Sequence, residues 1–374
     1  MDQLTPVTNV TMDKDIDLVL ITGAGASREF GTQGTKLPLM GDWSEALIAK
    51  LGQKGPDYLE VTGLHGGMSG PEFEAQLGQF LQQVAAFPMI ESIVGASINF
   101  QSLRSSTIGA QGVLDNWHSQ VLFQLKQIVE SIRESLYDQF AEDKCDVTKA
   151  TNAYRSLFEA LGISGHTKLV YATTNYDLIG ESVIERLGAL PDWGQPARIS
   201  FSGEVPLNVS NILNGMPRYT PVLHLHGRVG WYRRIDPTGK TTSTYSTSVM
   251  KHQQGLGDPI VMLPNPDKIY DDELISPIWD EFKRALRRAK AVLVLGHSLN
   301  DKALVDAIIS NVDRLDRVAV TALDSAASLD LNEKIKGLLD GVEVITPLRF
   351  GSDEEGSCMA VTEWMDNLRQ EKLP

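Results

Sequence analysis

Seven short apolar segments, each followed by glycine or polar residues, are the feature that most constrains how this chain can fold. They are rich in Val, Ile and Leu, and most are apolar on both faces, which is typical of strands buried between two layers. Helical patterns separate the segments, and this alternation predicts an α/β fold with a largely parallel sheet. The predicted strands are residues 18–22, 168–173, 222–225, 259–263, 291–295, 318–323 and 342–345.

A long helical region interrupts this pattern between the first two strands. Apolar residues recur at helical spacing from 114 to 140, which predicts one long amphipathic helix, and Pro71 marks the first turn of another. The polar segment 236–257 is expected to form a surface hairpin or a lid. We therefore expect a sheet core of about 15–50 and 165–348 and a helical insertion of about 60–160.

Composition excludes several classes of protein. The chain has 34 basic and 48 acidic residues, a net charge of −14, which disfavours direct binding to nucleic acid or anionic lipid. The densest basic cluster, 283–290, is interpreted as a solvated helix face. Cys145 and Cys358 are too few for a disulfide framework or a cysteine zinc cluster. No segment approaches the ~20 apolar residues of a membrane span, and residues 1–16 do not resemble a signal peptide. We expect a cytoplasmic protein without a bound metal.

The first predicted strand ends in a loop of small residues, within DLVLITGAGASREFG at 17–31. Glycine after a buried strand and before a helix lets backbone N–H groups approach a pyrophosphate, and the helix dipole favours its negative charge. Arg28 stands where the dinucleotide-binding fingerprint has its third glycine, so that fingerprint is incomplete. An ordinary strand-to-helix turn stays an alternative for this loop.

Three other predicted strands also end in polar or small residues. Carboxyl ends of parallel strands are where open sheets bind ligands, so these residues are candidates for a site. Asn175 and Asp177 have the alternative role of capping the next helix, and His224 is expected to be packed or hydrogen-bonded. His297 is expected to reflect the geometry of its own glycine turn, and Asp301, Arg28 and Asp324 are open between a ligand contact and a structural role. The candidate residues are found in YATTNYDLIGE (Asn175, Asp177), PVLHLHGRVGW (His224, His226) and AVLVLGHSLND (Gly296, Ser298, Asp301).

The motifs GAGAS, TTNYD, LHG and GHSLND, in this order, resemble the sirtuin (silent information regulator) family over residues 17–348. The resemblance is greatest to a bacterial branch of NAD-cleaving antiphage defence effectors. It implies one Rossmann-like catalytic region spanning 1–374, and NAD as the substrate. The implied activity is that of an NAD glycohydrolase that releases nicotinamide and ADP-ribose during abortive infection.

The resemblance also implies roles for individual residues. Asn175 matches the catalytic asparagine of the family, and Asp177 follows at the family's spacing and would stabilise a cation or orient its neighbours. His226 matches the family histidine, whose titration near neutrality suits a general base. The implied NAD-binding residues are Gly23, Ala24, Gly25 and Ser27 at the pyrophosphate, and Gly296, Ser298 and Asp301 near the adenosine half.

The chain departs from deacylating sirtuins, because two cysteines cannot form their four-cysteine zinc ribbon. This favours water over an acyl-lysine as the acceptor. An NAD-dependent protein deacylase and a non-catalytic NAD-binding subunit are the alternatives. Since an NAD-destroying enzyme needs restraint, we expect a separate activating or sensor subunit, with a HerA-like hexameric ATPase favoured by the resemblance.

A homo-oligomer is expected from the predicted helix at 114–140. Its apolar stripe is longer than a small lobe readily covers, so residues at both of its ends should stay partly exposed on a monomer and mark a partner surface. The alternative is that segments 71–87 and 90–98 cover the stripe. The residues expected at the exposed ends are Leu114, Trp117, Leu136 and Phe140.

Overall fold

The computed structural model describes ten ranges of the chain and one further residue. The ranges are 15–84, 108–140, 142–163, 166–194, 204–216, 218–236, 240–247, 257–262, 273–321 and 342–345, and the residue is 350.

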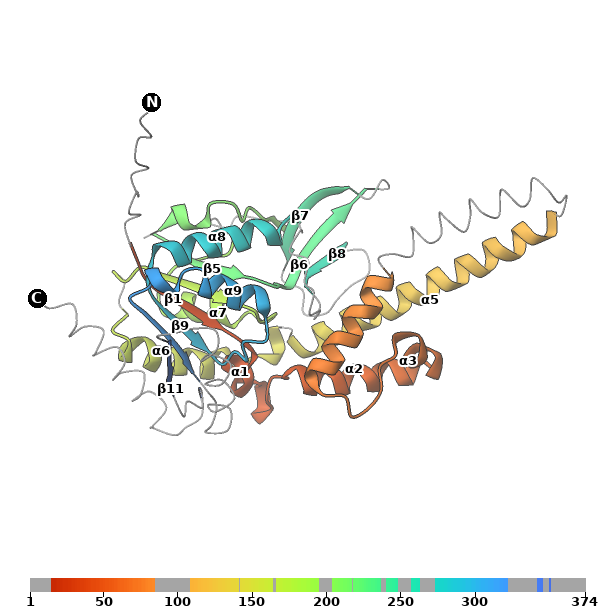
Figure 1. The fold of residues 1–374 in the computed structure, drawn as a ribbon, viewed down its shortest axis with the longest axis horizontal. Coiled ribbons are helices and arrows are strands. Elements are labelled where there is room, and N and C mark those ends of the chain that lie inside the picture. Colours follow the sequence, from red (N-terminus) through yellow and green to blue (C-terminus); the bar gives the residue numbers. More distant parts are fainter. Residues whose placement is uncertain are drawn as a thin grey trace, which may run out of the picture.

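A parallel sheet of seven strands forms the centre of the fold, in the order β11-β10-β9-β1-β2-β5-β3 (Figure 1). Neighbouring strands pair in parallel throughout. The predicted Rossmann-like α/β class is therefore confirmed. The strands are β1 (Ile16–Thr22), β2 (Leu169–Thr173), β3 (Pro191–Asp192), β5 (Thr220–His224), β9 (Ala289–Leu295), β10 (Arg317–Thr321) and β11 (Val342–Ile345).

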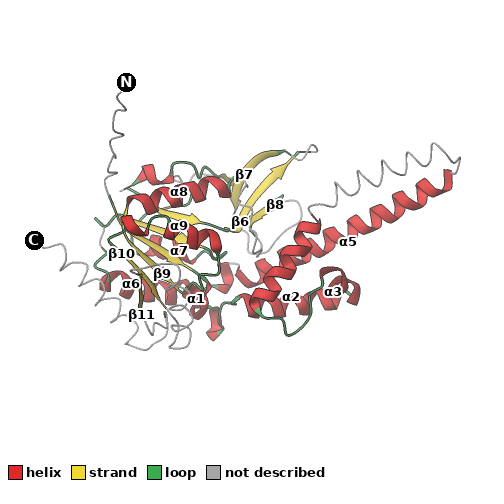
Figure 2. Ribbon diagram, viewed as in Figure 1, coloured by secondary structure: helices red, strands yellow, loops and turns green. Residues whose placement is uncertain are grey.

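Helices cover both faces of this sheet (Figure 2). Because successive side chains of a strand point to opposite faces, Ile21 packs in one apolar cluster and Leu20 in another. The cluster of Ile21 includes α8 (Ile275–Arg288) and α9 (Lys302–Ile309). The cluster of Leu20 includes α6 (Val147–Ala160) and α7 (Ile179–Arg186).

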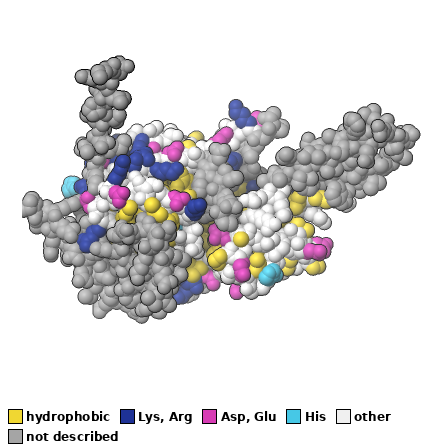
Figure 3. Space-filling model, viewed as in Figure 1, with side chains coloured by type: hydrophobic (Ala, Val, Ile, Leu, Met, Phe, Trp, Pro, Cys, Tyr) yellow, Lys and Arg dark blue, Asp and Glu magenta, His cyan; other side chains and the backbone are white. Residues whose placement is uncertain are grey.

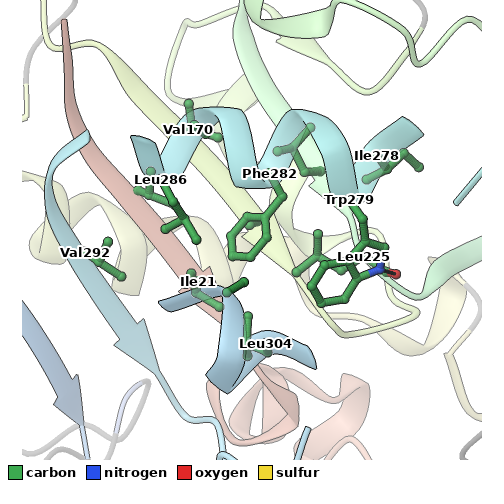
Figure 4. Packing of buried hydrophobic residues seen from close by; sticks show 14 of the residues in the cluster. Ile21, Val170, Leu225, Ile278, Trp279, Phe282, Leu286, Val292 and Leu304 are labelled. Atoms are coloured by element: carbon green, nitrogen blue, oxygen red, sulfur yellow. Dashed lines mark hydrogen bonds between the residues drawn. The ribbon is translucent and has the colours of Figure 1, made fainter. Parts of the chain in front are cut away.

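The amphipathic helix α8 forms the centre of the first cluster. Figure 4 shows Phe282 and Leu286 directed at the sheet, with Trp279 beside Leu225. The indole Nε1 of Trp279 donates a hydrogen bond to the Leu225 carbonyl at 2.9 Å. This bond satisfies the one polar atom of a buried side chain, so α8 is held to the end of β5 by both apolar and polar contacts.

A second sheet of four antiparallel strands follows β5, in the order β4-β7-β6-β8. The prediction that residues 259–263 form a strand of the main sheet is wrong, because β8 pairs with β6 instead. A short apolar run does not reveal which sheet it joins. The hairpin expected in 236–257 is confirmed in part, since β6 and β7 pair across residues 236–240. The strands are β4 (Glu204–Pro206), β6 (Gly227–Ile235), β7 (Thr241–Thr247) and β8 (Asp258–Val261).

The helical part of the chain projects away from the parallel sheet along α5 (Ile108–Phe140) (Figure 1). The predicted long helix is confirmed, although it begins earlier than residue 114 and its 33 residues span about 50 Å. Residues 70–84 are helical, as Pro71 predicted. The remaining helices are α1 (Ala24–Ser27), α2 (Met40–Lys54), α3 (Pro56–Thr62) and the short 3₁₀ segments Arg28–Phe30, Thr32–Gly34, Glu142–Lys144, Ile212–Gly215 and Val312–Arg314.

The expectation that the carboxyl end of α5 is exposed is wrong. Leu136 is 0% and Phe140 is 9% exposed, and both lie in a third apolar cluster. Three apolar side chains of the helical residues 70–84 belong to the same cluster, as the alternative interpretation proposed; they are Phe73, Leu77 and Phe80. The side chains of Leu114 and Trp117, and residues 90–98, lie outside the described part of the chain.

Two helices do not pack with the part of the chain to which the sequence assigned them, either the sheet core or the helical insertion. Helix α2 packs with α5, through Trp43 and Leu47, although its residues fall mostly within 15–50. Helix α6 packs on the parallel sheet, through Tyr154, although it falls within 60–160. The division of the chain into structural units stays a prediction.

Basic side chains gather over α8 on the face drawn in Figure 3. Two basic residues at the end of α8 and the start of β9 are paired: Arg288 contacts Asp15 at 2.6 Å, and Lys290 contacts Asp17 at 2.5 Å. Among the described helices, none is both long enough and apolar enough to cross a membrane.

We predict that Trp279→Ala lowers the free energy of unfolding by about 3–5 kcal/mol, because it leaves a cavity in the first cluster and an unpaired Leu225 carbonyl. Urea denaturation with an unchanged m-value measures the loss. Leu190→Ala, at a residue that is 54% exposed, is the control and should cost less than about 0.5 kcal/mol. Equal stability of the two variants would contradict this account of α8.

Candidate functional site

The candidate site lies at the carboxyl edge of the parallel sheet, where four neighbouring strands end. Strands β9, β1, β2 and β5 are consecutive in the sheet, although they are far apart in the sequence. Each is followed by one of the motifs found in the sequence. The chain enters the sheet at β1 and later returns to its other side at β9, and such a switch point is where open α/β sheets bind ligands.

Two glycine turns touch each other at the ends of β1 and β9. The N–H of Gly23 donates to the Leu295 carbonyl at 3.0 Å, and the N–H of Gly25 donates to the Gly296 carbonyl at 2.9 Å. A Cβ at Gly296, whose φ is +62°, would lie 2.2 Å from the Ala26 nitrogen. The glycines are thus required for the contact between the turns, and the amides of Gly23 and Gly25 donate within the protein. Ala24 and Ser298 are exposed beside them.

Asn175 ties the end of β2 to the first glycine turn. Its side-chain amide donates to the Gly23 carbonyl at 3.0 Å and to Ser27 Oγ at 2.9 Å, and the residue is 7% exposed. Both amide hydrogens are used in these bonds. The carbonyl Oδ1 is therefore the atom of this side chain that can accept a hydrogen bond from a ligand.

Ser27 and Asp177 continue this buried network beneath the turn. Burial raises the pKa of the Asp177 carboxyl, while hydrogen bonds from the Ser27 hydroxyl and from the Ile179 N–H oppose the rise. The bond to Ile179, at 3.0 Å, ties Asp177 to the first residue of α7, although Leu178 and not Asp177 is the N-cap residue of this helix. Ser27 is 3% exposed and links Asn175 to Asp177.

His226 follows β5 and faces the loop after β9. Its Nε2 lies 2.7 Å from Asp301 Oδ2, and the two residues are 5% and 8% exposed. The other oxygen of Asp301 accepts from the N–H groups of Ala303 and Leu304 in the first turn of α9. Asp301 therefore links the start of α9 to His226, the histidine that is expected to act as a base.

His224 lies apart from His226 in a buried charged group. It is 0% exposed, and its Nε2 lies 3.1 Å from Glu181 Oε2. Glu181 also pairs with the Arg228 guanidinium, which lies over the rings of Trp193 and Trp231. Burial alone would raise the pKa of Glu181, but Arg228 and His224 outweigh it and lower this pKa to about 2. The interpretation of His224 as a packed, hydrogen-bonded residue is confirmed.

Sequence reasoning missed Glu181 and Arg228 as parts of this region. Two charged residues were the available signal: Glu181 lies on the buried face of a short helix, one turn after Asp177, and Arg228 follows Gly227 directly.

Three other candidates have separate outcomes. Arg28, open between a ligand contact and a structural role, pairs with Asp42 at 2.5 Å. His297 accepts from the Leu299 N–H at 2.9 Å, as expected of a residue that shapes its own loop. Asp324 lies outside the described residues.

The site thus presents an amide oxygen, an imidazole and a buried carboxyl beside two exposed small residues. Such groups can orient a hydroxyl or a water and take a proton from it. Within the described ranges, there is no cluster of three or more His, Cys, Asp or Glu side chains suited to a metal ion.

No protein-family model matches the chain, and no curated protein matches it. Solved Sir2 structures are similar to it over nearly the whole length. One, described under the mechanism and regulation of Sir2 enzymes, has a TM-score of 0.42 and 14% identity, covering 95% of this chain and 93% of that chain. A complex of a Sir2 homolog with NAD has a TM-score of 0.36 and 14% identity, covering 95% and 90%. Sir2 bound to an acetylated peptide has a TM-score of 0.35 and 12% identity, covering 95% and 92%.

We predict that Glu181→Gln costs about 3–5 kcal/mol of unfolding free energy at pH 7, because it leaves Arg228 as a buried unpaired charge. The folded-state pKa of Glu181, about 2, lies below its ordinary value of 4.5. Its contribution is therefore complete above about pH 4.5 and is lost as the pH falls toward 2. Urea denaturation between pH 7 and pH 3 should show the difference between wild type and variant shrinking.

The control is Glu29→Gln, which breaks the partly exposed ion pair with Lys36 at 2.7 Å and should cost less than about 1 kcal/mol. A Glu181→Gln variant as stable as the wild type at pH 7 would contradict the assignment of Glu181 as a buried charged group.

Proposed function

We propose that this protein is an NAD glycohydrolase that cleaves NAD to nicotinamide and ADP-ribose. The observation that carries the proposal is the gathering of Asn175 and His226 with the two glycine turns at one edge of the sheet. Four motifs that are spread over residues 23–301 of the sequence follow the strands that end there. The resemblance to NAD-cleaving members of the sirtuin family assigns these same residues to the substrate.

The proposed reaction breaks the glycosidic bond between nicotinamide and ribose. Nicotinamide already carries a positive charge in NAD, so it leaves as a neutral molecule with the bonding electron pair and needs no general acid. A positive charge develops on the ribose as the bond breaks. Asn175 Oδ1 would orient a ribose hydroxyl or the attacking water, His226 would take the proton of the attacking group, and Asp177 would hold Ser27 and the first turn of α7 in place.

Water is the proposed acceptor. The four-cysteine zinc ribbon that supports the acyl-lysine groove of deacylating sirtuins cannot form from two cysteines. We interpret the helical region that contains α5 as the replacement for the small domain that carries this ribbon in the family. The alternative, a deacylase reaction, would be revealed by NAD-dependent deacetylation of an added acetylated peptide.

We also propose a biological setting from the resemblance: an effector subunit of bacterial antiphage defence, restrained until a separate subunit activates it. A HerA-like hexameric ATPase is the proposed partner. The absence of activity in the purified chain, followed by activity after addition of such an ATPase, would support this pairing.

We predict that the chain, alone or with its activating subunit, converts NAD to nicotinamide and ADP-ribose, and that Asn175→Ala and His226→Ala each lower the rate about 100-fold or more. The reason is that each variant removes a group that orients or deprotonates the attacking oxygen. Chromatography of the products measures the rate, and circular dichroism verifies the fold.

The matched controls are Asn152→Ala on α6 and His65→Ala, both at exposed positions, which should keep the wild-type rate. Wild-type nicotinamide release by both site variants would show that the site is misassigned. Transfer of an acetyl group from an added peptide to ADP-ribose would show that the enzyme is a deacylase.

We predict that the chain self-associates through the outer part of α5, where Phe123 is 63% exposed. Light scattering at micromolar concentration should give a multiple of 41.1 kDa, and Phe123→Asp should lower that mass. A strictly monomeric wild-type mass would contradict this proposal.

A further inference from the structure

Asp301 was assigned from the sequence to the NAD-binding residues, but its two carboxylate oxygens have protein partners. Oδ1 accepts from Ala303 N at 3.1 Å and Leu304 N at 3.3 Å, and Oδ2 lies 2.7 Å from His226 Nε2. The carboxylate is therefore held on one side by α9 and holds the imidazole on the other. Both residues are at least nine-tenths buried.

The loop that carries Asp301 reaches across the site from another strand. Strands β1 and β2 lie between β9 and β5, so the loop and the His226 side chain together cover three strand spacings, about 14 Å. Two hydrogen bonds support the loop: Thr321 Oγ1, at the end of β10, accepts from Gly296 N at 3.1 Å, and His297 Nδ1 accepts from Leu299 N within the loop at 2.9 Å. Leu299 has φ of +56°, a left-handed conformation that is uncommon outside glycine. Such strain persists where the surroundings fix the backbone.

We propose that Asp301 is the positioning residue of His226: it keeps the imidazole proton on Nε2, which makes Nδ1 the nitrogen that acts as the base. A carboxylate beside Nε2 can only accept, so the neutral imidazole donates there and keeps its lone pair on Nδ1. The statement that Nδ1 takes the proton of the attacking water rests on the proposed function. The statement that the neutral imidazole carries its proton on Nε2 does not rest on the proposed function.

In the reaction, the oxygen of water bonds to the ribose carbon as the bond from that carbon to nicotinamide breaks. The water proton passes to His226 Nδ1, and the electron pair of the broken bond leaves with nicotinamide. The imidazolium that forms is stabilised by the Asp301 carboxylate, since an opposite charge at hydrogen-bond distance favours the charged form. The proton is later released to solvent.

Other titratable groups near the pair have partners of their own. Tyr176 donates to the Met262 carbonyl at 2.5 Å, and its pKa is raised by burial and by the charges of Glu74 and Asp301. Glu74, from the helical residues 70–84, acts on that tyrosine. On the segment of His226 itself, His224 and Arg228 share the carboxylate of Glu181.

The alternative is that Asp301 only caps α9, and Asp301→Asn separates the two roles. Asn is as good an N-cap as Asp, so the helix start is kept. With its oxygen at the cap, the Asn amide would direct N–H toward His226 Nε2. That nitrogen must then accept, and the proton moves to Nδ1.

The test is ¹⁵N NMR of histidine-labelled full-length protein, with His226 assigned by the His226→Gln variant. We expect the Nε2–H tautomer in the wild type, the Nδ1–H tautomer in Asp301→Asn, and a His226 pKa lower by about one unit because the carboxylate charge is gone. Nicotinamide release should fall about 100-fold in this variant. Asp146→Asn is the matched control, because Asp146 caps α6 through Lys149 N at 2.9 Å, and it should change none of these readouts.

An Nδ1–H tautomer in the wild type, or an unchanged His226 tautomer and pKa in Asp301→Asn, would overturn the proposal even if the enzyme cleaves NAD. An Nε2–H tautomer that switches in Asp301→Asn would support it even if no nicotinamide is released, and that second result would count against the proposed function alone. The two hypotheses therefore fail by different measurements.

Discussion

The close contact between the turns after β1 and β9 is the constraint on which the candidate site depends. Gly25 donates to the Gly296 carbonyl, and no side chain fits at either position without moving the opposite backbone. The contact fixes the Gly23 carbonyl and Ser27, which hold Asn175, and it fixes the start of the loop that ends in Asp301. Separation of the turns would displace the asparagine and the partner of the histidine together.

Two buried carboxyl groups one helical turn apart lie behind this contact, and their environments act on them in opposite directions. Asp177 has its pKa raised by burial, whereas Arg228 and His224 lower the pKa of Glu181. The difference arises because Glu181 has a buried cation beside it and Asp177 has neutral donors. Groups of one type whose pKa values are shifted apart are typical of functional sites. The Arg228 guanidinium of the charged pair also lies over the rings of Trp193 and Trp231, so the pair contributes to the stability of the region that carries the site.

Local patterns predicted those features that depend on one segment at a time. The apolar runs at 18–22 and 291–295 predicted buried strands because both of their faces are covered, and the spacing of apolar residues predicted α5. The same patterns failed where pairing with a distant segment decides the outcome. Residues 259–263 were predicted to join the main sheet, but β8 pairs with β6. Phe140 was predicted to be exposed, but the centroid of its ring lies 5.6 Å from that of Tyr176.

The sequence by itself determined the class of fold, the ends of the four strands at the site to within one residue, and the residue types placed there, because strand burial, helical spacing and glycine turns are local properties. The tertiary structure alone decided which of these residues meet. Asp301 lies 75 residues after His226, and no periodicity relates them. They come together because the strand order places β9 and β5 on either side of β1 and β2, and because the loop after β9 crosses that distance. A hydrogen bond between distant segments is fixed by the packing of the whole sheet, which no short stretch of sequence contains.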